Sequence, residues 1–313
     1  MQQPADSGKQ SAAAPRVVVV GGSGSIGLAV SANLGRDCDV LTLTRFEPPA
    51  DGPANVTWRQ CDLFAPDELD AHLSGRDVAV YLVHTRLPSA RLDQAKCEDM
   101  DLIIADNVAR AAARQGIRQI LCLRGLVADD DPDAETRARR NEVVEALGAY
   151  GTPVTVLRAS LVVAPGGSTV NLIAGLVDGA RIVPVPRWAN HPKQPIALPD
   201  LLRAIRECVL DPALAGGDYE IGGPVVTDWR GILRRAAELV KAHPRIVALR
   251  WCPRWLYAWW VRRRNPAAHP ALARLLVADL EHDGVARANP LQTRIAEGAL
   301  APREAISPFL EDL

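Results

Sequence analysis

Four glycines that follow a run of valines are the strongest candidates for chemistry in this sequence. The stretch VVVVGGSGSIGLAV leads from four β-branched residues through these glycines into an apolar helical pattern. Glycine permits a strand-to-helix turn and the close approach of a pyrophosphate, and a helix N-terminus offers free amides to phosphates. The alternative is a glycine turn without a ligand. The G-x-G-x-x-G spacing favours a dinucleotide site formed by Gly21, Gly22, Ser23, Gly24, Ser25, Ile26 and Gly27.

The end of the next β-branched run indicates which dinucleotide would bind. This run ends LTLTRFEPP, so Thr44 and Arg45 stand where an acidic residue would bind the ribose 2′-hydroxyl of NAD. An arginine at this place matches the 2′-phosphate of NADP instead. We therefore expect Arg45 to bind NADP. NAD stays an alternative, because Glu47 follows two residues later and Arg45 could be a solvated strand end.

The elements that must position these residues alternate along the first half of the chain. Short β-branched runs predict strands at 17–20, 40–44, 56–59, 78–83, 120–123 and 154–157. Helical patterns separate them, and this alternation is typical of βαβ units with a parallel sheet. The prediction is an α/β fold, namely a Rossmann doubly wound parallel sheet with a smaller, mostly helical C-terminal substrate or lid region.

The same pattern predicts the domain organisation. Residues 16–158 with about 190–222 are expected to form the nucleotide-binding domain, and about 159–189 with 223–313 the substrate or lid region. The first fifteen residues are polar and small and are expected to be a disordered tail rather than a signal peptide. No window approaches eighteen consecutive apolar residues, so no transmembrane helix is expected.

Three helices can be placed from the sequence. Apolar residues recur at helical spacing before Gly116, which closes that helix, at Ile104, Val108, Ala111 and Ala112. A later helix is expected to open at Asp200, whose side chain can cap the free amides. The stretch TDWRGILRRAAELVKA predicts an amphipathic helix, with an inner face made of Trp229, Ile232, Leu233, Ala236 and Val240.

Composition excludes several classes of protein. The chain has 313 residues, 48% of them hydrophobic, and its 36 basic residues are offset by 37 acidic ones, which gives no footprint for nucleic acid. The six cysteines are scattered without a C-x-x-C motif, so neither a disulfide framework nor a metal site is expected. A reducing cytoplasm fits this usage best.

With these motifs the chain resembles the short-chain dehydrogenase/reductase superfamily, in its extended or atypical NAD(P)-binding branch. That branch includes isoflavone-reductase-like proteins, nitrogen-regulator-type sensors and sugar-nucleotide epimerase relatives. The resemblance is carried by GGSGSIG, CDLFAPDEL, YLVHT, VLRASLVVAPG, PIALPDLLRAI and YEIGGP. It implies that Asp62, with its neighbour Leu63, contacts the adenine. It also implies that Leu82, Val83 and His84 line the cofactor near its ribose and nicotinamide.

The chain departs from this superfamily at the residues that transfer protons. Typical members carry Tyr-x-x-x-Lys after the fifth strand, where the lysine lowers the tyrosine pKa. Here Thr136 and Arg140 take those positions, and Arg124 and Gly125 replace the usual serine. Arg140 can hold a ribose or phosphate but cannot act as a base at ordinary pH. His84 is then the remaining catalytic candidate, with a structural histidine as the alternative.

A tryptophan-rich stretch near the C-terminus, CPRWLYAWWVRRRNP, allows three interpretations. Trp255, Leu256, Trp259 and Trp260 are expected to share a helical face, with arginines at the helix end. The favoured interpretation is a lid helix that packs its tryptophans on the substrate region. The others are a peripheral membrane or protein contact through residues 254–264, and a pocket for an apolar substrate. In PRWANHP, Trp188 and His191 are either pocket residues or loop anchors.

Three functions remain open from the sequence. The favoured one is an NADP(H)-dependent oxidoreductase on a small, largely apolar carbonyl or enone. The second is a non-catalytic NAD(P)-binding redox sensor or accessory subunit of a membrane-associated complex, suggested by the missing Tyr and Lys. The third is an isomerase or epimerase with tightly held cofactor, which the fold also supports. A homodimer is an expectation from the resemblance alone.

Overall fold

A parallel sheet carries the first half of the chain. The computed structural model describes residues 14–48, 52–83, 97–126, 134–164 and 166–297, with the backbone alone for 97–98 and 134–140. Within these residues, seven parallel strands lie in the order β11-β6-β5-β4-β1-β2-β3. Their bounds are β1 Arg16–Val20, β2 Asp39–Thr44, β3 Val56–Gln60, β4 Val78–Tyr81, β5 Gln119–Gly125, β6 Val154–Ala159 and β11 Asp218–Ile221. The predicted doubly wound α/β fold is confirmed.

Strand β1 lies inside the sheet, between β2 and β4. Val17 pairs with Val40 on one side and with Val78 on the other. All four valines of β1 are completely buried. A continuous β-branched run suits a strand that is covered on both faces, which explains why the valines are not interrupted by polar residues.

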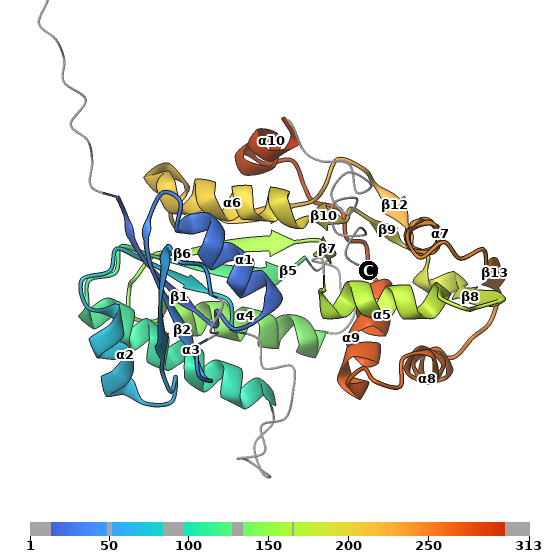
Figure 1. The fold of residues 1–313 in the computed structure, drawn as a ribbon, viewed down its shortest axis with the longest axis horizontal. Helices are drawn as coiled ribbons and strands as arrows, with labels where there is room; N and C mark the ends of the chain where they lie inside the picture. Colours follow the sequence, from blue (N-terminus) through green and yellow to red (C-terminus); the bar gives the residue numbers. More distant parts are fainter. Residues whose placement is uncertain (1–13, 49–51, 84–96, 127–133, 165, 298–313) are drawn as a thin grey trace, which may run out of the picture.

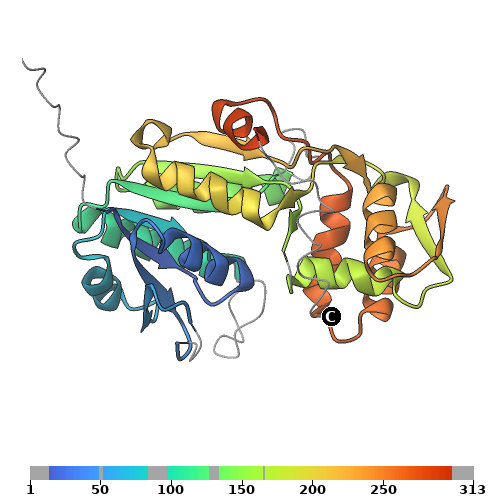
Figure 2. The same cartoon turned by 45° about the horizontal axis from the view of Figure 1, so that its top comes forward.

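Helices cover both faces of the sheet (Figures 1 and 2). On one face α1 (Ser25–Leu34), α6 (Leu198–Leu210) and α10 (Pro290–Ala296) pack into one apolar cluster with the strands. On the other face α2 (Pro66–Leu73), α3 (Cys97–Arg114) and α4 (Ala134–Gly148) form a second cluster. Because both faces are closed by helices, the open edge for a ligand is at the carboxyl ends of the strands.

Two helix predictions have different outcomes. In α3 the four residues at helical spacing are buried, and Gly116 ends the turn with a φ of +71°, as expected. The predicted start of α6 at Asp200 is wrong, because the helix begins at Leu198 after Ala197. Pro199 accounts for the earlier start, since proline lacks an amide and fits a first helical turn. Asp200 is buried in that turn and accepts a hydrogen bond from Arg203 instead of capping.

A second, mostly helical region lies beside the sheet (Figure 1). It contains α5 (Ser168–Val177), α7 (Trp229–Leu239), α8 (Arg254–Arg264), α9 (Pro270–Leu280) and the parallel strands β8 (Ile182–Pro186) and β13 (Arg245–Leu249). These elements share a third apolar cluster. Its centre includes Trp229, Ile232 and Leu233 of α7, which are buried as predicted, while Ala236 and Val240 are half-buried at its margin.

Short strands join the two regions. β7 (Val162–Val163) pairs with β10 (Ile196–Ala197), and β9 (Pro192–Lys193) pairs with β12 (Thr227–Asp228). The turns η1 (Arg187–Ala189) and η2 (Pro212–Leu214) complete the connections. None of the helices in the described ranges is long and apolar enough to cross a membrane.

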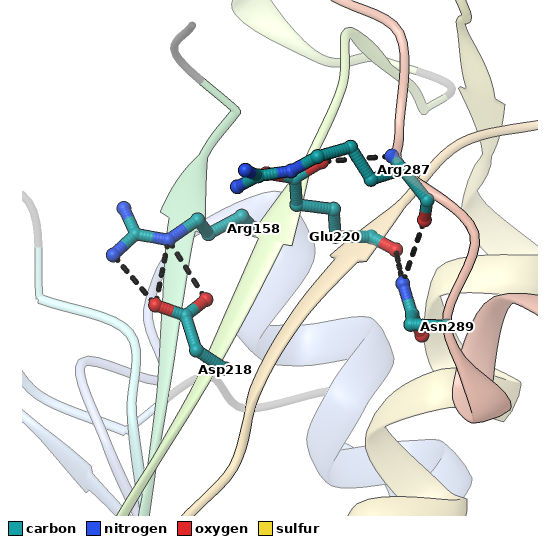
Figure 3. A network of polar contacts seen from close by, with 5 residues as sticks. All are labelled: Arg158, Asp218, Glu220, Arg287 and Asn289. Atoms are coloured by element: carbon teal, nitrogen blue, oxygen red, sulfur yellow. Dashed lines mark hydrogen bonds and ion pairs between the residues drawn. The ribbon is translucent and has the colours of Figure 1, made fainter. Parts of the chain in front are cut away.

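Ion pairs fasten the segment before α10 to the outer strand β11 (Figure 3). Glu220 of β11 is buried and accepts hydrogen bonds from the Arg287 backbone amide and from Arg287 Nε, each at 2.8 Å. Asn289 Nδ2 donates to the Glu220 carbonyl at 2.7 Å. Asp218 of the same strand accepts a bidentate pair of hydrogen bonds from Arg158 of β6, Nε to Oδ1 and Nη2 to Oδ2, each at 2.8 Å. The end of the described chain is thereby held against the sheet.

Candidate functional site

Three glycines of the loop between β1 and α1 are held in place by the backbone turn or by close contacts with other parts of the protein. Gly21 leaves β1 with a φ of +90°, a region that favours glycine. A Cβ on Gly22 would lie 1.9 Å from Thr42 Cγ2, and one on Gly27 would lie 2.7 Å from the Cα of Gly22. These three positions therefore need glycine for the turn and for the packing of α1 on β1 and β2.

Gly24 differs from the other glycines of this loop, because a Cβ on Gly24 would meet no atom within 4 Å from the rest of the described chain, apart from its immediate neighbours. It is the N-cap of α1, and no side chain caps the helix there. Ser23, Gly24 and Ser25 are exposed, and the first turn carries no acidic residue. The open side of Gly24 thus faces free amides and the positive end of the helix dipole, which is a fit for a phosphate group.

Arg45 follows β2 at the same edge of the sheet. Its side chain is exposed, and its guanidinium carbon lies 5.1 Å from the centre of the Phe46 ring. Gln60 of the neighbouring strand donates a hydrogen bond to the Arg45 carbonyl at 3.1 Å. Among the described residues the Arg45 guanidinium has no ion-pair partner, so its charge is available to an anion.

Asp62 and Leu63 follow β3. The exposed Asp62 carboxylate accepts a hydrogen bond from the Phe64 amide at 3.0 Å, and the Asp62 amide donates to Glu68 of α2 at 2.9 Å. Asn107 of α3 donates to the Leu63 carbonyl at 3.1 Å. These bonds fix the turn and leave a carboxylate oxygen of Asp62 facing solvent. Its contact with adenine stays a prediction.

Leu82 and Val83 follow β4 beside the glycine loop. Both are half-buried, and the Leu82 amide donates to the Val20 carbonyl at 2.9 Å. A Cβ on Gly21 would lie 3.1 Å from the Leu82 carbonyl carbon and from the Val83 nitrogen. Leu82 and Val83 are therefore in contact with the glycine loop, and their contact with a cofactor stays a prediction. His84, the catalytic candidate next to it, lies outside the described residues.

A buried arginine stands at the end of β5. Arg124 pairs in register with Arg158 of β6, and its Nε has no hydrogen-bond partner among the described residues. Burial raises the pKa of the nearby Cys122 thiol to about 11, and the charges of Arg124 and Arg158 oppose that rise. Arg140, the other catalytic candidate, lies in α4, and its side chain is among those not described.

Comparison with known proteins agrees with this geometry. Residues 21–161 match the family model described as NAD(P)H-binding. We call this segment, which is less than half of the chain, the NAD(P)H-binding domain after that family model. The auxiliary protein GraX of Staphylococcus aureus is 32% identical over 141 residues, which are 45% of this chain and 42% of that protein. The match thus spans less than half of that relative.

Solved structures share the fold over nearly the whole chain. A nucleoside-diphosphate-sugar epimerase from Staphylococcus aureus aligns over 95% of this chain and 99% of its own, with a TM-score of 0.69 and 15% identity. An NADPH-dependent quinone oxidoreductase from Escherichia coli aligns over 93% and 98%, with a TM-score of 0.70 and 16% identity. At these identities the likeness shows the fold alone.

The NAD(P)H-binding domain brings the predicted loop residues and the ends of β2, β3 and β4 to one edge of its sheet. Sequence reasoning named Arg124 only as a replacement for serine and missed that it is buried. The signal was present, because Arg124 continues the apolar run QILCL, whose residues alternate between the two covered faces.

Outside the NAD(P)H-binding domain, two predictions about aromatic residues have different outcomes. Trp188 is a loop anchor, since its Nε1 donates to the Cys252 carbonyl at 2.7 Å and its ring meets Tyr257 edge-on. The expectation that α8 packs its tryptophans inward is wrong for Trp255 and Trp259, which are exposed. Tyr257 and Val261 occupy the inner side of α8 instead, and Trp260 is half-buried beside them, stacked on Tyr257.

Proposed function

We propose that this chain is an NADP(H)-dependent oxidoreductase for a small, largely apolar carbonyl or enone. The observation that carries the proposal is Gly24, which has an open side at the uncapped N-terminus of α1, just beyond the carboxyl end of β1. Arg45 supports NADP over NAD, because an exposed guanidinium without an ion pair among the described residues suits a 2′-phosphate.

The chain's own residues bind and orient the cofactor in this proposal. The amides from Ser23 to Gly27 hold the pyrophosphate, Arg45 holds the 2′-phosphate, and Asp62 with Leu63 holds the adenine. The dinucleotide, when bound, supplies hydride chemistry. Leu82 and Val83 form an apolar wall near the nicotinamide and exclude water from that side, which suits an apolar substrate.

Proton transfer needs a group other than the tyrosine of related enzymes. The chain has four tyrosines, and none stands four residues before a lysine. His84 can hold and release a proton near neutral pH. Arg140 and Arg124 keep their charge at ordinary pH, so they are assigned to holding an oxygen or phosphate and not to moving a proton.

Replacing Arg45 tests the cofactor assignment. We expect Arg45→Gln to raise the Kd for NADPH about tenfold or more and to change that for NADH less than about twofold, because a charge-assisted contact to the 2′-phosphate is lost. Titration of nucleotide fluorescence measures both constants. Arg36→Gln, an exposed arginine after α1, is the matched control and should change neither. Equal loss of NADPH and NADH affinity in Arg45→Gln would contradict the assignment.

A non-catalytic NAD(P)-binding auxiliary protein is the second candidate. Two observations favour it, namely the missing Tyr-x-x-x-Lys pair and a relative that is itself named an auxiliary protein. The two candidates are separated by NADPH oxidation with a panel of apolar aldehydes, ketones, enones and quinones. Substrate-dependent turnover that His84→Ala lowers supports the oxidoreductase. Tight NADPH binding without turnover on any member of the panel supports the auxiliary protein.

A further inference from the structure

Helix α8 turns its large apolar side chains toward solvent. The exposed fractions are 71% for Trp255, 57% for Trp259 and 38% for Leu256, and Trp251 in the preceding loop is 82% exposed. Trp255 and Trp259 are four residues apart and therefore share one face of the helix. A surface helix of a globular protein normally carries polar residues on this side. We call Trp251, Trp255, Leu256 and Trp259 the tryptophan face.

The fold does not need this face, because the other side of α8 is already packed. Tyr257 and Val261 are buried there. The Tyr257 hydroxyl accepts a hydrogen bond from Trp229 Nε1 at 2.9 Å, and the Tyr257 ring stacks on Trp260 at 5.4 Å between centroids. The tryptophan face is thus a separate surface and not the inner side of a poorly packed helix.

The sequence around this face carries basic residues but no acidic ones. Residues 239–278 contain eight Lys or Arg and no Asp or Glu, in a chain whose formal net charge is -1. Arg262 and Arg263 are exposed one to two turns beyond the tryptophans, on the same outward side of the helix. Neither has an ion-pair partner among the described residues, whereas Arg254 at the other end pairs with Glu281. A partner for this surface must supply negative charge.

An open basic cavity continues this character beyond the end of α8. It has a volume of about 620 Å³, and its lining includes Arg181, Lys241, His243 and Arg245. Arg264, the last residue of α8, donates to the carbonyl of Asp178, which also lines the cavity. The cavity and the helix end are therefore neighbours and offer an anionic group several cations.

We propose that α8 binds the surface of an anionic phospholipid bilayer. Tryptophan is suited to the bilayer interface because its ring is apolar and its N–H is polar, while arginine contacts phosphate. The absence of acidic residues over residues 239–278 favours a surface of uniform negative charge over a protein partner. Figure 1 shows α8 in the helical region beyond the sheet, at the opposite end of the molecule from α2.

The experiment is flotation of the full chain with vesicles of phosphatidylcholine alone or with about 30% phosphatidylglycerol. We expect binding only to the anionic vesicles, and release at high salt, because screened arginines lose their attraction. Two variants are compared with wild type, Trp255→Ala with Trp259→Ala and Arg262→Gln with Arg263→Gln. Each is expected to lower the partition constant about tenfold or more. The charge-matched control, Arg36→Gln with Arg234→Gln, should bind as wild type does.

Other results would overturn the proposal or assign the tryptophan face to a different partner. Absence of binding to anionic vesicles by wild type, or equal binding by all variants, would overturn the proposal. A concentration-dependent dimer in light scattering that is lost in the tryptophan variant would assign the face to a second copy instead. NADPH titration and thermal unfolding of each variant show that the fold is kept. Because the nucleotide site is untouched, failure here leaves the proposed function standing, and the reverse also holds.

Discussion

At the scale of single residues, the glycines of the loop after β1 fall into two groups. Gly21, Gly22 and Gly27 are required by the protein, which approaches each of them closely. Gly24 is required by nothing in the described chain, and its backbone angles, φ −80° and ψ 163°, are open to any residue. The proposed nucleotide would give a reason for glycine at this position.

Alanine substitutions test the two groups of glycines separately, one by stability and one by nucleotide binding. We expect Gly22→Ala to lower the free energy of unfolding by about 1–3 kcal/mol, because its Cβ meets Thr42. Gly24→Ala should change stability by less than about 0.5 kcal/mol but weaken NADPH binding about tenfold, since the methyl group occupies the open side. Denaturant unfolding and nucleotide titration measure the two effects.

A second substitution at the contact is the control for this prediction. Thr42→Ser removes Cγ2, so the pair Gly22→Ala with Thr42→Ser should regain part of the lost stability. If Gly24→Ala binds NADPH as tightly as wild type does, the pyrophosphate does not lie against that residue.

At the scale of elements, the outer strand β11 depends on side chains from distant parts of the chain. Its Glu220 is buried and receives Arg287 from the segment before α10, whereas its Asp218 is half exposed and receives Arg158 from β6 (Figure 3). Buried charged hydrogen bonds contribute more than exposed ones, because water competes less with them. We therefore expect Glu220 to contribute more to the free energy of unfolding than Asp218 does.

Amide substitutions measure that difference. Glu220→Gln is expected to lower the free energy of unfolding by about 1–3 kcal/mol, and Asp218→Asn by at most about 1 kcal/mol. Hydrogen exchange should show that Glu220→Gln loosens α10 in particular, since the segment before it loses its anchor. Equal costs for both substitutions would mean that Glu220 contributes no more than a surface pair.

At the scale of the whole molecule, each of the three apolar clusters contains at least one cysteine, so the reactivity of the thiols measures how well each cluster is closed to solvent. Cys61 and Cys122 lie in one, Cys38 and Cys208 in another and Cys252 in the third. All five are free and buried. Burial raises the pKa of Cys61 to about 12 and that of Cys208 to about 12, so the reactive thiolate is scarce near neutral pH.

A thiol reagent tests this packing in a Cys97→Ser variant, which leaves only the five buried thiols. At pH 8 they should react more than about a hundredfold slower in the native protein than in denaturant, because the chain must open first. Colorimetric thiol titration gives both rates. Rapid reaction of a single native thiol would show that its cluster is open to solvent.

Local patterns were sufficient to predict much of this fold. The valine run of β1, the helical spacing in α3 and the G-x-G-x-x-G loop each encode their structure within about ten residues. The prediction failed at two places where neighbouring residues compete for the same position. Asp200 reads as a cap, yet Pro199 starts the helix earlier and Arg203 takes its carboxylate. Trp255 reads as an inward residue, yet Tyr257 and Val261 already fill that side.

The sequence by itself determined the succession of strands and helices in the sheet, the glycine loop and the arginine after β2, because those depend on short-range backbone preferences and on residue type at fixed spacing. Only the tertiary structure decided which glycine has an open side, that Arg124 is buried at the end of β5, and that Trp255 and Trp259 of α8 face solvent. The reason is physical: burial and open space are properties of all the atoms that meet at a place, and most of those atoms come from residues far away in the sequence.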